Sequence, residues 1–383
     1  MTGAAAARRA RTMTETIHVL TPHCGLRSAS QLGGEVFERQ VLLRLPGYGV
    51  VPHIGLPSSR ALESVPPGWD VQVLRPGRGL RWYVAPAAFF PYALRQLRGR
   101  RIDLIRAHAP RFVGPSLLAA RWALRCPGVP LVVHHHHAEP GIGGAVDRWV
   151  IRRAALVIVP SQVVKDNVVS QGVAESRVAV IPNGAELAAA HADGLCWKQP
   201  PGARLLFMSR LVSRKRPLVA IETAAALARE FPRLELIVVG RGELDETVRT
   251  HARTLGVADR VQFVPWVSEA TKAWLLKTAD VFLMPSSLEG FGLVALESQL
   301  AGTPVVGGPA AALAEVIVPG ETGLLVDEAA ASFASATRTL LESGERRAAF
   351  GAAGRRHAAT FSWDAAASAT ADAYRRTLAE AGL

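Results

Sequence analysis

Val281-Phe-Leu-Met284-Pro-Ser-Ser-Leu-Glu289-Gly-Phe-Gly292-Leu-Val-Ala-Leu-Glu297 is the stretch that decides the fold of this chain. Four apolar residues predict a buried strand, and the two glycines let the backbone turn tightly into a helix that begins at about Gly292. The first amides of a helix lack intrahelical partners, so this turn can bind an anion or a hydroxyl. Glu297 lies about one and a half turns inside the helix, where a carboxylate can accept hydrogen bonds from a vicinal diol. Alone, the two glutamates are ordinary loop and helix charges, but the strand, turn and helix together favour a ligand site.

Short β-branched runs alternate with longer Ala- and Leu-rich stretches on both sides of this segment. That alternation predicts an α/β protein with parallel sheets covered by helices, and the apolar runs suit strands buried on both faces. The strands expected in the first half are Thr16–Leu20, Val71–Leu74, Ile102–Ile105, Leu131–Val133, Leu156–Val159 and Val178–Ile181. Those expected in the second half are Leu205–Met208, Leu234–Val239, Val261–Val264, Val281–Met284, Pro304–Val306 and Leu324–Val326.

A loop between the two halves predicts two domains. Asn183–Gly202 contains Asn-Gly, Asp-Gly and Pro-Pro dipeptides, which are typical of turns. The length of 383 residues suits two doubly wound domains better than one. Because open parallel sheets bind ligands beyond the carboxyl ends of their strands, we expect the site in the cleft between the domains.

The composition and net charge limit the kinds of partner and the cellular location that we expect for this chain. The net charge of +12 suits an anionic substrate, an anionic membrane surface or nucleic acid, but the arginines form no tract and no nucleic-acid module is visible. Three widely spaced cysteines, Cys24, Cys126 and Cys196, indicate reduced thiols and a cytoplasmic protein. The sequence has no apolar run of transmembrane length, and its Ala- and Arg-rich start lacks the apolar core of a secretory signal.

Several segments share their order and spacing with one enzyme family. Glu289-x7-Glu297, followed by Ala301-Gly-Thr-Pro-Val-Val306 and Glu321-Thr-Gly-Leu-Leu-Val326, resembles the retaining glycosyltransferases of family four. The resemblance extends to Gly33-Gly34, Val180-Ile-Pro-Asn-Gly184, Ser209-Arg-Leu-Val-Ser-Arg-Lys-Arg-Pro217, Val239-Gly-Arg-Gly242 and Phe361-Ser-Trp-Asp364. It implies the GT-B fold, in which two Rossmann-like domains face each other across a cleft.

The resemblance also implies how the chain is divided. Residues 1–14 would be a disordered tail and residues 15–185 an N-terminal, acceptor-side domain. A linker over 186–202 would lead to a C-terminal domain, 203–360, that binds the nucleotide sugar. The last segment, 361–383, would be a helix that crosses back to the first domain.

The family's donor-site residues can be placed on this sequence. The resemblance assigns donor binding to Gly33, Gly34, Arg210, Lys215, Gly242, Glu289, Gly290, Phe291, Gly292, Leu293 and Glu297. Two departures, Val264-Pro-Trp-Val267 and Gly307-Gly-Pro-Ala-Ala-Ala-Leu-Ala-Glu315, lie where the family has other turns. The first of these turns is near the nucleobase, so we favour UDP only as the commonest donor base of the family.

Arg210 and Lys215 would act on the leaving group. Both follow the strand Leu205–Met208 and would project from its carboxyl end. A departing nucleoside diphosphate gains negative charge, and fixed cations stabilise that transition state more than the ground state. The resemblance adds Glu289 and His136, so that the expected catalytic residues are Arg210, Lys215, Glu289 and His136. With these cations, we expect no metal and no other cofactor.

Four consecutive histidines, His134 to His137, follow the strand Leu131–Val133. Neighbouring side chains of an extended chain point to opposite faces, so at most alternate residues converge, which disfavours a metal site. The resemblance places the donor-sugar histidine at His136, with His134 or His135 as alternatives. It places His108 on the acceptor side, where a hydrogen-bonded histidine at a strand end is an equally good interpretation.

Residues 81–101 mix aromatic side chains with arginines. Such a segment suits either peripheral contact with the inner face of a membrane or a helix that packs on the first sheet, and we favour the helix.

The resemblance implies transfer of a sugar from a nucleotide diphosphate to a hydroxyl of an unidentified acceptor, with retention of configuration by front-face attack. Two alternatives stay open: a nucleotide-sugar epimerase of the same fold, and a non-catalytic nucleotide-sugar-binding relative. Neither the sugar, the acceptor nor the oligomeric state follows from the sequence.

Overall fold

The computed structural model describes residues 15–24, 26, 33–57, 62, 64–74, 86–136, 142–197 and 202–383. The expected tail over 1–14, the segment 81–85 and His137 lie outside the described residues. The chain divides into two compact units, residues 1–184 together with Trp363–Leu383, and Ala185–Ser362. In this division the segment 186–202, expected as a linker, belongs to the second unit.

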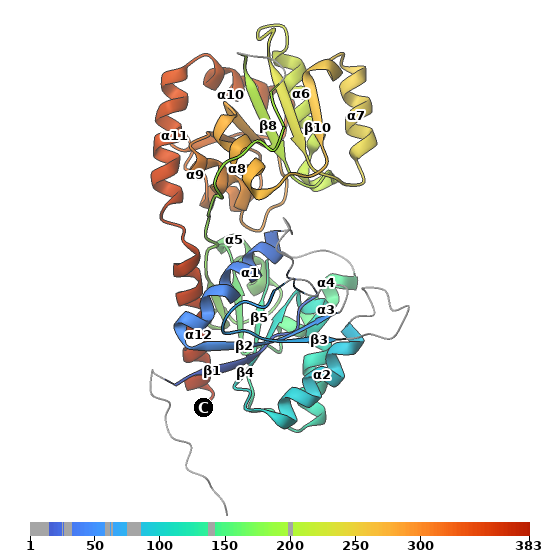
Figure 1. Cartoon of the computed structure of the whole chain (residues 1–383), viewed down its shortest axis with the longest axis vertical. Helices are drawn as coiled ribbons and strands as arrows, with labels where there is room; N and C mark the ends of the chain where they lie inside the picture. Colours follow the sequence, from blue (N-terminus) through green and yellow to red (C-terminus); the bar gives the residue numbers. More distant parts are fainter. Residues whose placement is uncertain are drawn as a thin grey trace, which may run out of the picture. The chain divides into compact units, whose positions relative to one another are not determined.

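The first unit is built on a seven-stranded, fully parallel sheet in the order β3-β2-β1-β4-β5-β6-β7 (Figure 1). Its strands are β1 Ile17–Leu20, β2 Val50–Pro57, β3 Asp70–Leu74, β4 Leu104–His108, β5 Leu131–His134, β6 Leu156–Val159 and β7 Val178–Val180. Its helices are α1 Gly33–Arg44, α2 Pro86–Gly99, α3 Pro110–Ala123, α4 Ile142–Ile151, α5 Gln162–Ser170 and α12 Trp363–Glu380. The sequence therefore brings its last helix back to its first sheet.

Two strands of this sheet differ from the sequence-based expectation. We missed β2, because Pro52, His53 and Gly55 interrupt its apolar run, yet it pairs with β1 on one side and β3 on the other. The strand expected over Ile102–Ile105 is β4, which begins at Leu104 and continues to His108. It continues past Ile105 although Arg106 is charged, because that side chain is paired inside the domain.

The second unit contains a six-stranded, fully parallel sheet in the order β10-β9-β8-β11-β12-β13. Its strands are β8 Arg204–Met208, β9 Glu235–Val239, β10 Val261–Val264, β11 Val281–Met284, β12 Val305–Gly307 and β13 Gly323–Leu325. Its helices are α6 Pro217–Leu227, α7 Asp245–Thr254, α8 Glu269–Thr278, α9 Leu293–Ala301, α10 Ala330–Leu341 and α11 Gly344–Ala358. All six strands expected in this half of the sequence are present within one or two residues.

Each sheet has one point where its strand order reverses. In the first unit the chain runs from β1 outward to β3 and then returns to β4, on the other side of β1. In the second unit it runs from β8 outward to β10 and returns to β11, beside β8. Ligands of open α/β sheets bind outside the carboxyl ends of the strands at such a point. The fold thus marks two places for functional side chains, one in each unit.

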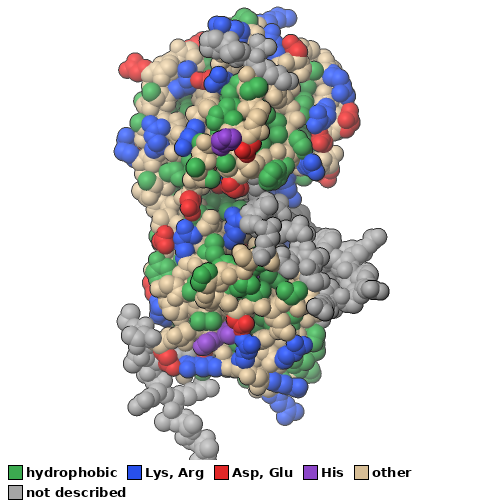
Figure 2. All heavy atoms as spheres, in the orientation of Figure 1, with side chains coloured by type: hydrophobic (Ala, Val, Ile, Leu, Met, Phe, Trp, Pro, Cys, Tyr) green, Lys and Arg blue, Asp and Glu red, His purple; other side chains and the backbone are tan. Residues whose placement is uncertain are grey.

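The described part of the aromatic segment forms α2, which packs inside the first unit. Phe89, Tyr92 and Ala93 of α2 are buried in the core of the sheet, as expected for a helix that covers it. No helix among the described residues combines the length and the apolar character that a membrane crossing requires. On the face in view in Figure 2, Lys and Arg side chains are scattered among Asp and Glu rather than gathered in one tract.

Candidate active-site residues

Lys215 and Glu289 meet at the reversal point of the second sheet. Lys215 follows β8 and Glu289 follows β11, and because these strands are neighbours their loops lie together. The Lys215 ammonium contacts Glu289 Oε1, and the two side chains are 12% and 9% exposed. Burial lowers the pKa of Lys215 below its ordinary value, with Arg214 and Arg210 acting in the same direction, while Glu289 opposes the shift. The structure thus places a compact cation and a carboxylate, both partly accessible, at the expected edge.

Backbone contacts hold the surrounding loops in register. Ser287 N donates to Arg214 O at 3.0 Å, which joins the loop after β11 to the loop after β8. Leu211 N donates to Arg241 O at 2.9 Å, which joins the loop after β8 to the turn after β9. A side chain at Gly242 would collide with the backbone of Leu211, so glycine is required for this approach. Arg210, next to Leu211, is exposed.

Helix α9 begins with a residue conformation that favours glycine. Gly292 precedes the helix with φ 100°, in the left-handed region, and a Cβ there would lie 2.7 Å from Leu313 Cδ2. Without a side chain, Gly292 cannot cap the first amides of the helix, which therefore suit an acceptor on a ligand. Phe291 is buried behind this turn, while Gly290 and Leu293 are partly exposed.

Glu297 has a partner that the sequence did not reveal. It is buried on α9, and its Oε1 accepts a hydrogen bond of 2.8 Å from Lys272 Nζ of α8. Lys272 also pairs with Glu269, at 2.6 Å. Burial raises the pKa of Glu297, and the charge of Lys272 opposes that shift. Glu297 lies just over one turn inside α9, as expected from the spacing.

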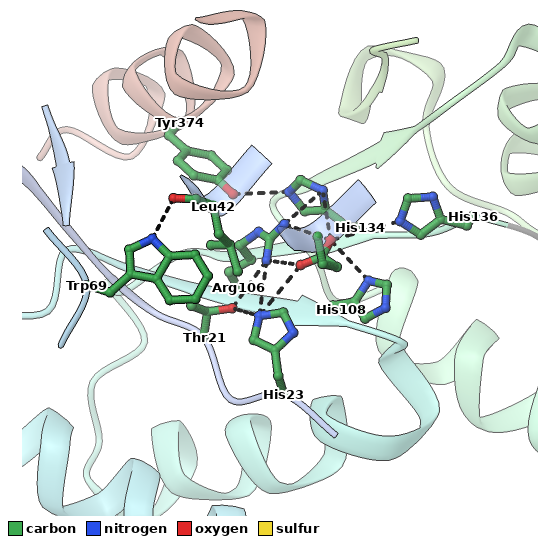
Figure 3. A network of polar contacts seen from close by, with 10 residues as sticks. Thr21, His23, Leu42, Trp69, Arg106, His108, His134, His136 and Tyr374 are labelled. Atoms are coloured by element: carbon green, nitrogen blue, oxygen red, sulfur yellow. Dashed lines mark hydrogen bonds and ion pairs between the residues drawn. The ribbon is translucent and has the colours of Figure 1, made fainter. Parts of the chain in front are cut away.

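The first unit carries a second polar cluster, centred on Glu38 of α1 (Figure 3). Glu38 and Arg106 of β4 are both fully buried, and Arg106 donates to both carboxylate oxygens, with NH2 at 2.7 Å from Oε1. Burial alone would raise the pKa of Glu38, but the charge of Arg106, together with His108 and His136, holds it well below its usual range. The cluster therefore contains an ionised carboxylate with no solvent contact.

Histidines from two neighbouring strands, β4 and β5, surround that carboxylate. His108 Nδ1, at the end of β4, lies 3.1 Å from Glu38 Oε1, and His136 Nε2, after β5, lies 3.9 Å from the same oxygen. His134 Nδ1 is also 3.9 Å from it, so alternate residues of the histidine run converge on one atom. His108 and His136 are 15% and 14% exposed, whereas His134 is fully buried. Of His134 to His136, only His136 is partly exposed, which favours it for contact with a substrate.

Two further side chains, His23 and Tyr374, also contact residues of this cluster. His23, after β1, lies 2.9 Å from Thr21 Oγ1 and 3.6 Å from Glu38, and burial lowers its pKa to about 3. His134 Nε2 lies 3.1 Å from the Tyr374 hydroxyl of α12. The last helix of the chain therefore takes part in the polar cluster of the first sheet.

The glycine pair lies at this cluster. Gly33 begins α1 and Gly34 follows it, so the pair opens a helix instead of forming a loop by itself. A Cβ at Gly34 would lie 3.5 Å from His108 Cε1. The structure thus brings together Gly34, His108 and His136, and separately Lys215, Gly242, Glu289 and Gly292. It assigns these two groups to different units.

The sequence analysis missed Glu38, Arg106, Lys272 and Tyr374. Two signals were available for the first pair. Glu38 lies between Phe37 and Val41 on the apolar face of α1, and Arg106 lies between the buried apolar residues Ile105 and Ala107 of β4. A charge in such a place requires a buried partner.

Known proteins match both halves of the chain. The family described as Glycosyltransferase Family 4 matches residues 6–189, and Glycosyl transferases group 1 matches residues 198–357. D-inositol 3-phosphate glycosyltransferase of Kineococcus radiotolerans is 35% identical over 322 residues, which cover 73% of this chain and 72% of that protein. The chain belongs to glycosyltransferase family 4. D-inositol 3-phosphate glycosyltransferase 2 of Catenulispora acidiphila is 42% identical over 190 residues, which cover 47% of this chain and only 44% of that relative.

Solved structures support the fold of this family 4 member. Anabaena HepE, determined in complex with UDP-glucose, matches with a TM-score of 0.71 at 21% identity, over 95% of this chain and 98% of HepE. At that identity the likeness shows the GT-B fold alone. The two Rossmann-like units with fully parallel sheets are those of a GT-B glycosyltransferase, as the sequence predicted.

Proposed function

We propose that this family 4 protein transfers a sugar from a nucleotide-diphosphate sugar to a hydroxyl of an acceptor, with its donor site at the reversal point of the second sheet. The observation that carries the proposal is the pairing of Lys215 with Glu289 beside the glycine-capped start of α9. A cation, a carboxylate and the first amides of a helix are groups that bind the phosphates and hydroxyls of a nucleotide sugar.

Each group has a chemical role in this proposal. Lys215 and Arg210 bind the diphosphate and stabilise the charge that grows as the glycosidic bond breaks. In the absence of ligand Glu289 neutralises Lys215, and with the donor bound it accepts hydrogen bonds from sugar hydroxyls. Glu297 accepts from the ribose diol through Oε2, because Lys272 occupies Oε1. For the first unit, considered by itself, we propose that His136 and Gly34 bind sugar hydroxyls and that His108 contacts the acceptor.

We further propose that UDP is the preferred nucleotide, that configuration is retained, and that no metal takes part. HepE, solved with UDP-glucose, is the structural parallel for the nucleotide. Retention follows from attack on the face from which the diphosphate leaves, with a phosphate oxygen helping to take the acceptor proton. The oxocarbenium-like transition state is then stabilised by the diphosphate and by sugar hydroxyl contacts. We place the protein in the cytoplasm, with peripheral membrane contact as the alternative.

The test is a transfer assay with UDP-glucose, UDP-N-acetylglucosamine and GDP-mannose against a panel of hydroxyl acceptors, followed by mass spectrometry and proton NMR of the product anomer. Wild-type protein should form a product with the donor's anomeric configuration. Lys215→Ala should reduce kcat/KM at least about 100-fold, as for loss of a group that stabilises transition-state charge. The exposed Lys277→Ala is the matched control and should stay within twofold of wild type. Interconversion of the donor sugar without any acceptor would refute transfer in favour of an epimerase.

A further inference from the structure

We propose that Glu38 is a positioning residue that holds His108 in its Nδ1–H tautomer, so that His108 Nε2 is offered as an acceptor for a substrate hydroxyl. That a substrate hydroxyl binds His108 Nε2 rests on the proposed function. That Nδ1 of His108 carries the proton does not. The contact that carries the inference is the 3.1 Å distance between His108 Nδ1 and Glu38 Oε1 (Figure 3).

The first step concerns the protonation of Glu38. This carboxylate has no solvent exposure, and Arg106 donates to both of its oxygens. The fixed guanidinium keeps Glu38 ionised, and an ionised carboxylate can only accept hydrogen bonds. Any other group that hydrogen-bonds Oε1 must therefore do so as a donor, as Arg106 does through NH2 at 2.7 Å.

The second step concerns the imidazole of His108. Of its two nitrogens, Nδ1 is the one that lies 3.1 Å from Oε1, and the attraction of the carboxylate for a proton on that nitrogen favours the Nδ1–H form of the neutral ring. Nε2 then has a free lone pair, and it lies on the side of the ring near Gly34, where a Cβ would be 3.6 Å away. The missing side chain of Gly34 leaves room beside Nε2. A carboxylate behind a histidine thus sets the orientation of the ring and favours one tautomer.

The third step distinguishes this arrangement from a metal site. Donor atoms of Glu38, His108 and His136 lie within 4.8 Å of one another, a set that a divalent transition metal would accept. However, Arg106 NH2 is 2.7 Å from the same Oε1. A dication on that oxygen would lie against a buried guanidinium with one carboxylate to balance three positive charges. A proton on His108 satisfies the same oxygen without that repulsion.

The tautomer can be measured without any substrate. In protein labelled with ¹⁵N-histidine, long-range proton–nitrogen NMR distinguishes the two tautomers, and His108→Gln identifies the His108 signals. Wild-type protein at pH 7.5 should show His108 as the Nδ1–H form. Glu38→Gln should give a mixture of both forms, because an amide donates as well as accepts. Glu35→Gln, a carboxylate change on the same helix, is the matched control and should leave the tautomer unchanged.

Glu38→Gln leaves Arg106 without a counter-charge and can unfold the first unit. The double variant Glu38→Met/Arg106→Met removes both charges of the buried pair, and such replacements often keep the fold. It should fold, as judged by its circular dichroism, and should also show a mixed tautomer at His108. Comparison of these two variants separates a folding defect from an effect on the His108 tautomer.

Activity provides the second readout. Glu38→Gln should lower kcat of glycosyl transfer at least tenfold while the calorimetric Kd for UDP stays within twofold, since the nucleotide site lies in the second unit. A wild-type His108 in the Nε2–H form, an unchanged tautomer in both variants, or stoichiometric Zn²⁺ binding that shifts His108 and His136 together would overturn the inference. If no donor supports transfer but the tautomer responds as described, the proposed function fails and the role of Glu38 in fixing His108 stands.

Discussion

Single buried charges define the chemistry at the residue scale. Lys215 with Glu289, Lys272 with Glu297, and Arg106 with Glu38 each place a cation next to a carboxylate, with little or no exposure to water. Replacement of a buried ion pair by apolar residues is often neutral or stabilising, so such pairs are weak evidence for stability. The pairs with partly exposed members, Lys215 with Glu289 and the histidines around Glu38, are the ones that can meet a ligand.

His23 leads to a prediction about acid stability. Burial lowers its pKa from the ordinary 6.5 to about 3, so the folded protein binds its proton only at low pH. Below pH 6.5 the unfolded chain takes up a proton that the folded chain does not, and stability is lost as the pH falls towards 3. Between pH 7.5 and pH 5 this residue alone should remove about 2 kcal/mol of unfolding free energy.

Urea unfolding of wild type, His23→Gln and the exposed His191→Gln at the two pH values checks this. The glutamine at position 23 does not titrate, so that variant should lose about 2 kcal/mol less than wild type on acidification. His191→Gln should follow wild type. An equal acid loss in wild type and His23→Gln would show that His23 is protonated in the folded state.

At the element scale, the start of α9 depends on one glycine. Gly292→Ala would place a Cβ in the left-handed region and 2.7 Å from Leu313 Cδ2. We expect a loss of about 2 kcal/mol in unfolding free energy. Because the first turn of α9 would shift, we also expect at least tenfold weaker nucleotide binding by calorimetry. Gly344→Ala, at the start of α11 with its nearest contact at 3.9 Å, is the control and should change neither quantity. Unchanged nucleotide binding by Gly292→Ala would show that the start of α9 is not part of the donor site.

The strands of the fold were more predictable from the sequence than the pairing of charged side chains. In the second unit β9, β11 and β12 are buried along their whole length and β8 is buried from Leu205 onward, so their apolar runs are visible in a single sequence. In β2, Pro52 and His53 break that pattern, and the strand is held by its neighbours on both sides. Lys215 and Glu289 were predictable because each follows a recognisable strand. Their pairing, like that of Lys272 with Glu297, depends on strand order, which a local pattern does not contain.

At the scale of the whole molecule, the last helix completes the first unit. Trp363 and Tyr374 of α12 are buried, the Trp363 ring lies 6.1 Å from that of Phe37, and Tyr374 contacts His134. Removal of residues 363–383 would expose this apolar surface and leave His134 without its hydroxyl partner. We expect hydrogen exchange to become fast in β1, β4 and β5 while the second unit keeps its protection.

The control for this truncation is removal of residues 381–383 only, which should preserve exchange protection in both units. Persistent protection of β1, β4 and β5 after removal of the whole helix would contradict the structural role of α12. Equal loss of protection in the two units would show instead that they do not unfold independently.

The central claim is that the second unit binds the diphosphate of a nucleotide sugar through Lys215 at the reversal point of its sheet. The most direct test is calorimetric titration of UDP and GDP into wild-type protein, Lys215→Ala and the control Lys277→Ala. We predict saturable binding of one nucleotide, with UDP favoured, unchanged in Lys277→Ala and at least tenfold weaker in Lys215→Ala. Absence of binding by folded wild-type protein, or equal binding by all three proteins, would contradict the account.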